Sequence, residues 1–121
     1  MKEEIFGPIL PVITFKDFSE AIRLVNRMEK PLVIYYFGHH FSDNFKRLEI
    51  ETSSGNLISN ETMYHLMNAD MPFGGVGLSG YGRYHGFEGF KGFSNMKGVM
   101  HKPSINVFPY TLGYPPFNKP K

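Results

Sequence analysis

Two short apolar segments, LVIYYF at residues 32–37 and NLIS at residues 56–59, decide the fold of this chain. An uninterrupted apolar run of strand length is typical of a strand that is buried on both faces of a parallel sheet. The residues between the two segments have helical periodicity, because Phe41, Phe45 and Leu48 share one face. A strand, a helix and a strand of these lengths predict right-handed crossovers in a parallel sheet, so the fold class is α/β.

The predicted central helix has a start and a stop signal. Ser42 can cap its first turn, since a serine hydroxyl accepts a hydrogen bond from a free backbone N–H there. Gly55, in the stretch ETSSG, can supply the left-handed residue that follows a last helical turn. We therefore expect this crossover helix to begin after Ser42 and to end before Gly55.

A further strand and helix are expected upstream. The segment ILPVITF at residues 9–15 is rich in β-branched and aromatic residues and predicts a strand, although Pro11 makes it an edge strand or a broken one. Asp17, followed by Glu20 three residues later, predicts a capped helix start. The apolar stripe of that helix repeats at helical spacing, and Pro31 marks its end.

Beyond residue 60 the periodicity disappears, and a structureless loop as long as residues 60–82 is unusual unless it lines a site. Residues 83–93 predict a short helix that packing must hold, because each of its glycines costs about 1 kcal/mol against alanine. The segment KGVMHK at residues 97–102 predicts one more strand. We accordingly divide the chain into a domain of residues 1–102 and a proline-rich extended arm of residues 103–121.

The glycine-rich stretch PFGGVGLSGYGRYHG, residues 72–86, contains the spacing G-x-G-x-x-G at Gly75, Gly77 and Gly80. A dinucleotide-binding loop follows a strand, opens a helix and precedes an acidic residue by about 20 positions. Here no clean strand precedes the glycines, and no Asp or Glu follows Glu88. Gly75 and Gly80 also have the spacing of a Walker A loop, but the required Lys is missing. Tight bending and close backbone packing are the expected role of these glycines.

The composition places the chain among ordinary globular proteins. It has 121 residues, 41% hydrophobic and 20% charged, with a formal net charge of +2, so we expect one domain or part of one. No apolar run approaches the roughly 18 residues that cross a bilayer, and we expect a cytoplasmic protein. The chain has no cysteine, which excludes a thiolate nucleophile, a cysteine-ligated zinc and a disulfide among these residues.

Metal and nucleic-acid binding are not expected. His39 and His40 are adjacent, so in an extended segment their rings would point to opposite faces, and no carboxylate sits at helical spacing to help either one. Residues 91–93 match the first three places of an RNA-recognition motif, but residues 94–96 break it. Five lysines follow Glu88 over 33 residues and form no dense basic patch.

Four segments, taken together, carry a family resemblance. In chain order they are EEIFGP (3–8), KPL (30–32), ETSSGN (51–56) and MPFGGVGLSGYGRYHG (71–86). Their order and spacing resemble the C-terminal part of aldehyde dehydrogenases, over essentially the whole chain to YPP at residues 114–116, and most closely the class 3 branch. The resemblance implies part of an oxidoreductase catalytic domain that converts aldehydes to carboxylic acids with NAD or NADP, and a homodimer.

The resemblance also implies roles for individual residues. Glu4 corresponds to the glutamate that accepts hydrogen bonds from the hydroxyls of the nicotinamide ribose, and Phe6 to a ring that packs beside the nicotinamide. Phe73 and His85 correspond to positions that line the class 3 aldehyde pocket, and Met67 corresponds more loosely to another. Core packing is the competing interpretation for these three side chains.

The missing cysteine separates this chain from the working enzymes of the family. Those enzymes attack the aldehyde with a cysteine thiolate and activate water with a glutamate, and in the family both residues precede the EEIFGP motif. We therefore expect a section of such an enzyme that is inactive alone, exposes an apolar face and self-associates. The alternatives are a non-enzymatic interaction module, which would pair with a full-length subunit, and nucleic-acid binding by the basic end.

Overall fold

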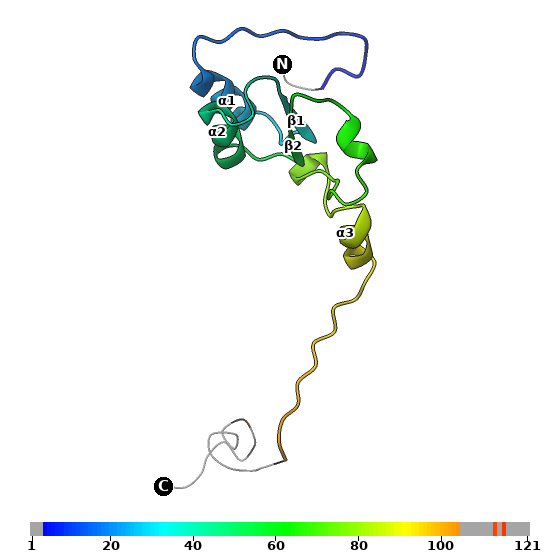
Figure 1. Cartoon of the computed structure of the whole chain (residues 1–121). Coiled ribbons are helices and arrows are strands. Elements are labelled where there is room, and N and C mark those ends of the chain that lie inside the picture. The colour runs from blue at the N-terminus through cyan, green and yellow to red at the C-terminus, as the bar shows by residue number, and fades with distance from the viewer. Residues whose placement is uncertain (1–3, 105–112, 114, 116–121) are drawn as a thin grey trace, which may run out of the picture.

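The computed structural model describes residues 4–104, 113 and 115, and its sheet joins two parallel strands. The elements in chain order are α1 (Phe18–Arg27), β1 (Val33–Tyr36), α2 (Asp43–Glu51), β2 (Asn56–Ser59), the 3-10 helices η1 (Tyr64–Met67) and η2 (Gly77–Ser79), and α3 (Gly86–Gly92). β1 pairs with β2 in parallel, with Val33 opposite Asn56 and Tyr36 opposite Ser59. α2 forms the crossover between them, which confirms the predicted α/β class (Figure 1).

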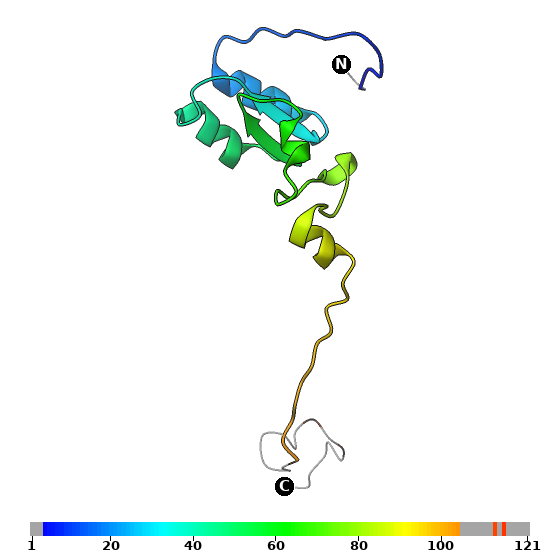
Figure 2. The same ribbon diagram turned by 45° about the vertical axis from the view of Figure 1, so that its right-hand side comes forward.

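Helices α1 and α2 lie side by side on one face of the sheet (Figures 1 and 2). The ring of Tyr36, on β1, packs between Phe18 of α1 at 6.2 Å and Phe45 of α2 at 5.6 Å between ring centroids. Successive side chains of a strand point to opposite faces, and Tyr35 accordingly contacts His65 of η1 at 5.8 Å. Both faces of β1 are therefore covered, by helices on one side and by the segment after β2 on the other.

The predicted helix starts are confirmed. The Asp17 carboxylate accepts a hydrogen bond from the Glu20 backbone N–H at 3.0 Å, and the Ser42 hydroxyl accepts one from the Phe45 N–H at 3.3 Å. The Glu20 carboxylate bonds the N–H of Lys16, one residue before the cap, at 3.1 Å. The bonds from Glu20 and Phe45 satisfy backbone donors that a helix start leaves free, and the bond from Lys16 ties the preceding residue to the first turn.

The predicted role of Gly55 as a left-handed residue is wrong. Helix α2 already ends at Glu51, and Thr52 follows it with an extended φ of −122°. Gly55 is not among the residues with positive φ. A glycine is required there for another reason, because a Cβ at this position would collide with the carbonyl oxygens of Leu32 and Gly74.

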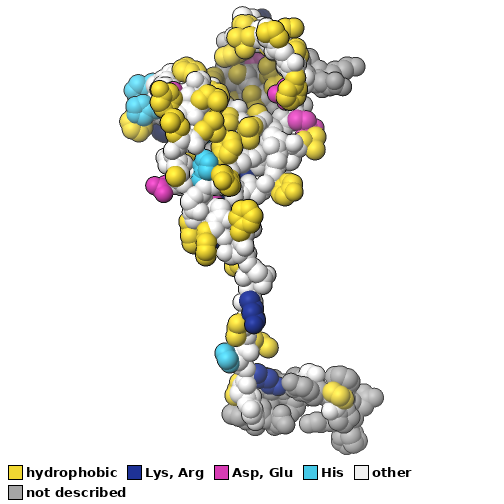
Figure 3. Space-filling view, turned by 90° about the vertical axis from the view of Figure 1, so that its right-hand side faces the viewer, with side chains coloured by type: hydrophobic (Ala, Val, Ile, Leu, Met, Phe, Trp, Pro, Cys, Tyr) yellow, Lys and Arg dark blue, Asp and Glu magenta, His cyan; other side chains and the backbone are white. Residues whose placement is uncertain are grey.

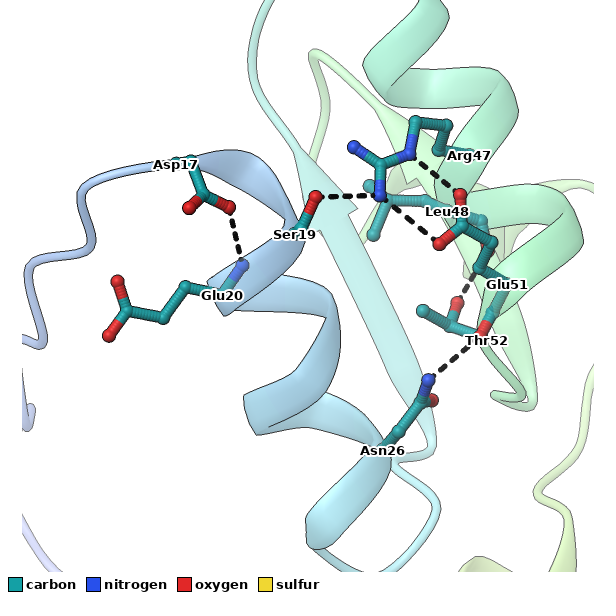
Figure 4. Close-up of polar contacts among 8 residues, drawn as sticks. All are labelled: Asp17, Ser19, Glu20, Asn26, Arg47, Leu48, Glu51 and Thr52. Carbon is teal, nitrogen blue, oxygen red and sulfur yellow. Dashed lines mark hydrogen bonds and ion pairs between the residues drawn. The ribbon is translucent and has the colours of Figure 1, made fainter.

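Polar contacts join α1 to α2 along their adjacent sides (Figure 4). The Arg47 guanidinium donates to the Ser19 hydroxyl at 3.0 Å and pairs with the Glu51 carboxylate at 2.6 Å. At the other end of α1, the Asn26 amide donates to the Glu51 carbonyl oxygen at 2.8 Å. Polar side chains therefore join the two helices at their exposed sides, and the apolar side chains of Ile22 and Leu48 are buried.

The ion pair between Arg47 and Glu51 predicts a pH-dependent stability. The hydrogen bond from Arg47 and its positive charge lower the pKa of the Glu51 carboxyl below its ordinary value. A carboxyl whose pKa is lowered by folding stabilises the fold above its unfolded pKa, and that contribution is lost as the pH falls through its folded pKa. We expect Glu51→Gln to lower the urea midpoint of the chain at pH 7 and to lower it less at about pH 3, because protonation of Glu51 weakens the pair as the pH falls toward and through its lowered pKa.

Glu49→Gln is the matched control for this experiment, because Glu49 is an exposed carboxylate on the same helix. The control should change the midpoint little and by a similar amount at both pH values, as most exposed substitutions do. An equal loss for Glu51→Gln at both pH values would contradict the assignment of pH dependence to this pair.

The predicted strands at residues 9–15 and 97–102 are wrong, because the structure has neither as a strand. Neither segment joins the sheet, and the first runs clear of it in both views (Figures 1 and 2). Leu10 is 86% exposed and Val12 is 82% exposed. β propensity alone does not make a strand, since a strand also needs a neighbour to accept its hydrogen bonds, and Pro11 has no N–H to donate.

Much apolar surface is exposed. Many large hydrophobic side chains of the described residues are open to solvent; Phe6 and Met96 are each 94% exposed and Phe93 is 91% exposed. Among the described residues only Ile22 and Leu48 are buried large hydrophobic side chains, and apolar side chains are spread over the face in Figure 3. The expected apolar surface is thus present, while self-association stays a prediction. No helix of the described residues is long and apolar enough to cross a membrane.

The short helix expected within residues 83–93 is present as α3, Gly86–Gly92. Of the predicted arm at residues 103–121, the structure describes residues 103, 104, 113 and 115, and the remainder, including most of the YPP motif, lies outside the described residues.

Candidate functional site

Five aromatic and imidazole rings form a contiguous cluster beneath the sheet. We call it the aromatic cluster, and its members in order of contact are Tyr35, His65, Phe73, His85 and Tyr84. Successive ring centroids lie 5.8, 6.0, 5.7 and 4.9 Å apart. One ring comes from β1, one from η1 and three from the glycine-rich stretch, so the cluster joins the sheet to the loop that follows it.

The glycine-rich stretch folds back on itself to bring Phe73 and His85 together. Phe73 and Tyr84 form an isolated antiparallel bridge, in which the Phe73 N–H donates to Tyr84 at 3.1 Å and the Tyr84 N–H donates to Phe73 at 2.7 Å. Inside this loop the Arg83 guanidinium donates to the carbonyl oxygens of Gly75 at 2.7 Å and Gly82 at 2.8 Å. The loop is therefore closed by its own backbone and braced by one arginine.

Gly75 explains why the stretch needs glycine. Its backbone is buried, and a Cβ would collide with the carbonyl group of Ser79 across the loop. The Ser79 hydroxyl bonds both the N–H and the carbonyl of Val76 at 2.9 Å, so this turn is tight. The expectation of tight bending and close packing is confirmed here, in the part of the chain whose spacing matched a dinucleotide loop.

Backbone strain gathers between β2 and α3. Within the described residues, the non-glycine positions with positive φ are Asn60 at 56°, Met63 at 67° and His85 at 74°. Asparagine tolerates this conformation, and Asn60 is held by two side-chain bonds of 2.8 Å to the backbone of Gly38. For Met63 and His85 the conformation costs on the order of 1–3 kcal/mol each and persists only where the surroundings enforce it. Such strain is concentrated at functional sites in many proteins.

His65 is a member of the cluster that the sequence pattern did not single out. It is 7% exposed, and neither of its ring nitrogens has a hydrogen-bond partner in the described part of the chain. The Nδ1 atom of His85 is likewise buried without a partner. The one signal for His65 in the sequence is its place among apolar residues in YHLM, which indicates burial but not contact with Phe73.

The other two histidines of interest differ from expectation. The rings of His39 and His40 are stacked at 5.5 Å with an interplanar angle of 10°, rather than on opposite faces. The segment is not extended, because the Ser42 N–H donates back to the His39 carbonyl at 2.9 Å and closes a turn. Adjacent side chains on a turn can point the same way, which the alternation of a strand forbids.

The candidate pocket residues are only partly brought together. Phe73 and His85 contact each other at 5.7 Å with nearly parallel rings. Met67 lies on η1 and is 80% exposed, so it is not enclosed together with these two rings. Glu4 and Phe6 lie on the exposed segment before α1, where Phe6 is 94% exposed.

Glu4 and Phe6 fit the nicotinamide end of a dinucleotide chemically. A carboxylate offers two acceptor oxygens to a vicinal diol, and a flat apolar ring can cover a nicotinamide face. Two short backbone bonds shape the segment, from Gly7 N–H to the Ile5 carbonyl at 3.0 Å and from Ile9 N–H to the Gly7 carbonyl at 2.8 Å. The exposed ring of Phe6 leaves an apolar face open, and a flat nicotinamide ring could stack on it.

Comparison with known proteins identifies the family. The model of the aldehyde dehydrogenase family matches residues 1–99. A probable coniferyl aldehyde dehydrogenase of Pseudomonas aeruginosa is 47% identical over 119 residues, which make up 98% of this chain and 24% of that protein. Aldehyde dehydrogenase family 3 member A2 of Pongo abelii is 44% identical over 121 residues, which make up 100% of this chain and 25% of that protein.

A solved structure described as the substrate-bound state of Staphylococcus aureus AldH has the same arrangement. It aligns with a TM-score of 0.73 and 39% identity over 92% of this chain and 25% of that one. The chain belongs to the aldehyde dehydrogenase family, and within it to the class 3 branch. It spans about a quarter of the length of the relatives that it matches.

Proposed function

We propose that this chain supplies the nicotinamide-ribose contact and one wall of the aldehyde pocket in an NAD(P)-dependent aldehyde dehydrogenase. The observation that carries the proposal is the fold-back of the glycine-rich stretch, which packs Phe73 against His85. These are the two side chains for which the family resemblance implied a common pocket wall, although they lie 12 positions apart along the chain.

Each proposed residue has a physical role. The Glu4 carboxylate accepts hydrogen bonds from the two ribose hydroxyls, and the Phe6 ring covers the nicotinamide and keeps water away from it. Phe73, His85 and Met67 form the wall that faces the aldehyde. When NAD or NADP is bound, it supplies the acceptor for the hydride that leaves the substrate. The nucleophile comes from outside these 121 residues, because they contain no cysteine.

The organisation of the protein is part of the proposal. We assign residues 1–102 to the catalytic domain and residues 103–121 to an extended arm. We also propose that the enzyme is cytoplasmic and that it forms a homodimer. The exposed apolar side chains, such as Leu10 and Val12, support assembly, since soluble monomers rarely leave large apolar patches uncovered. Gel filtration tests the dimer, and cell fractionation tests the location.

A chimaeric enzyme tests the proposed function. In it, this chain replaces the aligned quarter of the Pseudomonas aeruginosa relative, which then supplies the remaining three quarters. We expect the chimaera to reduce NAD or NADP with an aldehyde, at a rate within about tenfold of the intact relative. The 121-residue chain alone should show no such reaction. A soluble chimaera that binds neither cofactor nor aldehyde would contradict the proposal.

The exposed apolar surface also favours a second candidate, a non-enzymatic interaction module that pairs with a full-length subunit. This candidate predicts that the isolated chain co-elutes with the intact relative on gel filtration. If the chain co-elutes but the chimaera is inactive, the interaction module takes first place.

A further inference from the structure

His65 is buried in the aromatic cluster, although its two ring nitrogens make no hydrogen bond within the described residues. Its imidazole is enclosed by the protein, and burying a polar group without a hydrogen bond costs on the order of 1–3 kcal/mol. Both ring nitrogens are covered, so no group from outside the described residues can reach them while the cluster stays closed. The side chain is therefore held by the contacts of its ring.

Two ring contacts hold His65, one on each side along the cluster. Tyr35 meets it at 5.8 Å in a T-shaped arrangement with an interplanar angle of 68°, and Phe73 meets it at 6.0 Å. The edge-to-face arrangement with Tyr35 is one that aromatic pairs prefer, and the ring of Phe73 is tilted at 49° to that of His65. Among the described residues, His65 is thus the ring that joins Tyr35 of the sheet to Phe73.

The backbone that carries His65 is fixed from the same side. The Tyr35 hydroxyl accepts a hydrogen bond from the Met63 N–H at 3.4 Å and lies 3.9 Å from the Met63 sulfur. Met63 has a strained φ of 67° and immediately precedes η1, so Tyr35 holds the start of the helix that presents His65. Strand β1, which is hydrogen-bonded to β2, thereby sets the position of the His65 ring.

We propose that His65 is a positioning residue, whose ring transmits the position of β1 to Phe73 and so holds Phe73 against His85 in the aldehyde pocket wall. The proposal rests on the proposed function, because it gives Phe73 a role toward the aldehyde. The shape and aromatic character of the His65 ring carry this role, and its nitrogen atoms do not.

The test compares three substitutions in the chimaeric enzyme. His65→Ala removes the ring and should raise the aldehyde KM about fivefold or more, while the KM for NAD or NADP stays within about twofold. His65→Phe keeps a ring without nitrogens and should restore the aldehyde KM to within about twofold of the parent. His40→Phe is the matched control, because His40 is an exposed histidine outside the aromatic cluster, and it should change neither KM.

A double substitution tests whether His65 acts through Phe73. In a Phe73→Ala background, His65→Ala should raise the aldehyde KM no further, because residues that act through one contact are not additive. If His65→Ala does not fold, His65→Leu replaces it, since leucine fills the space without a flat ring. The same rise in aldehyde KM is then expected.

Several outcomes would overturn the proposal. One is a folded His65→Ala variant with an unchanged aldehyde KM, or one whose only loss is in the fraction of active enzyme, as a merely structural residue would give. Failure of His65→Phe to rescue, or additive effects with Phe73→Ala, would also reject it. An inactive parent chimaera would instead contradict the proposed function itself, so the two failures are distinguishable.

Discussion

Replacing Gly55 by alanine is expected to destabilise the fold strongly, because the added methyl group would collide with backbone atoms of two other segments. Gly55 lies where three backbones meet, and its new Cβ would collide with the carbonyl oxygens of Leu32 and Gly74 and lie 3.0 Å from the Cα of Gly75. Backbone atoms cannot rotate away as a side chain can, so the strands must separate. We expect a loss of about 3 kcal/mol or more, at the upper end of the overpacking range.

The same collision reaches the candidate site. Asn56, next to Gly55, donates to the Leu32 carbonyl at 2.9 Å through its backbone and to the Pro72 carbonyl at 3.0 Å through its side chain. Moving Gly55 breaks one or both bonds and releases the start of the glycine-rich stretch from β2. The substitution should therefore reduce aldehyde activity in the chimaera as well as its stability.

The measurement is the melting temperature and soluble yield of the chimaera with Gly55→Ala. Gly98→Ala is the matched control, because a Cβ on Gly98 meets nothing within 4 Å and its φ is not positive. The control should leave both quantities unchanged. A Gly55→Ala chimaera that is as stable as the control would show that the three backbones do not approach as closely as the structure has them.

The second large effect is expected at Glu4. Changing it to glutamine keeps the size of the side chain but removes its charge and one of its two acceptors. A hydrogen bond to a charged group contributes about 1.5–3 kcal/mol, so the KM for NAD or NADP in the chimaera should rise about ten- to a hundredfold. The aldehyde KM should change much less, since Glu4 is assigned to the cofactor alone.

Glu49→Gln is the control for this experiment, because it removes an exposed carboxylate from α2 without touching the segment around Glu4. Isothermal titration with the cofactor separates binding from turnover. If Glu4→Gln binds the cofactor as tightly as the control does, another residue makes the ribose contact. The role that the family motif implies for Glu4 would then be wrong.

The candidate site could be predicted from the sequence only in part. The family motif contains Phe73 and His85. Their contact, however, depends on the backbone bridge between Phe73 and Tyr84, which cannot be predicted from the periodicity of the sequence. His65 is not identified as a site residue by the sequence, because a histidine among apolar residues predicts burial but does not indicate which side chains it contacts. Met67, Glu4 and Phe6 remain assignments by resemblance, and their contacts would have to come from groups beyond these residues.

The sequence by itself determined the local features of this protein. The capped starts of α1 and α2 and the apolar run of β1 follow from interactions within a few residues, so the chain specifies them without help. The absence of a thiol is fixed by composition alone.

Only the tertiary structure decided which extended segments pair and which rings meet. Residues 9–15 have strand propensity but no neighbour to bond, whereas β1 and β2 pair because α2 returns the chain to the same sheet. Gly55 has no left-handed turn to make and is needed because distant backbones converge on it. The physical reason is the same in each case, since strand pairing and close packing join residues far apart in the chain, and a local pattern cannot specify its distant partner.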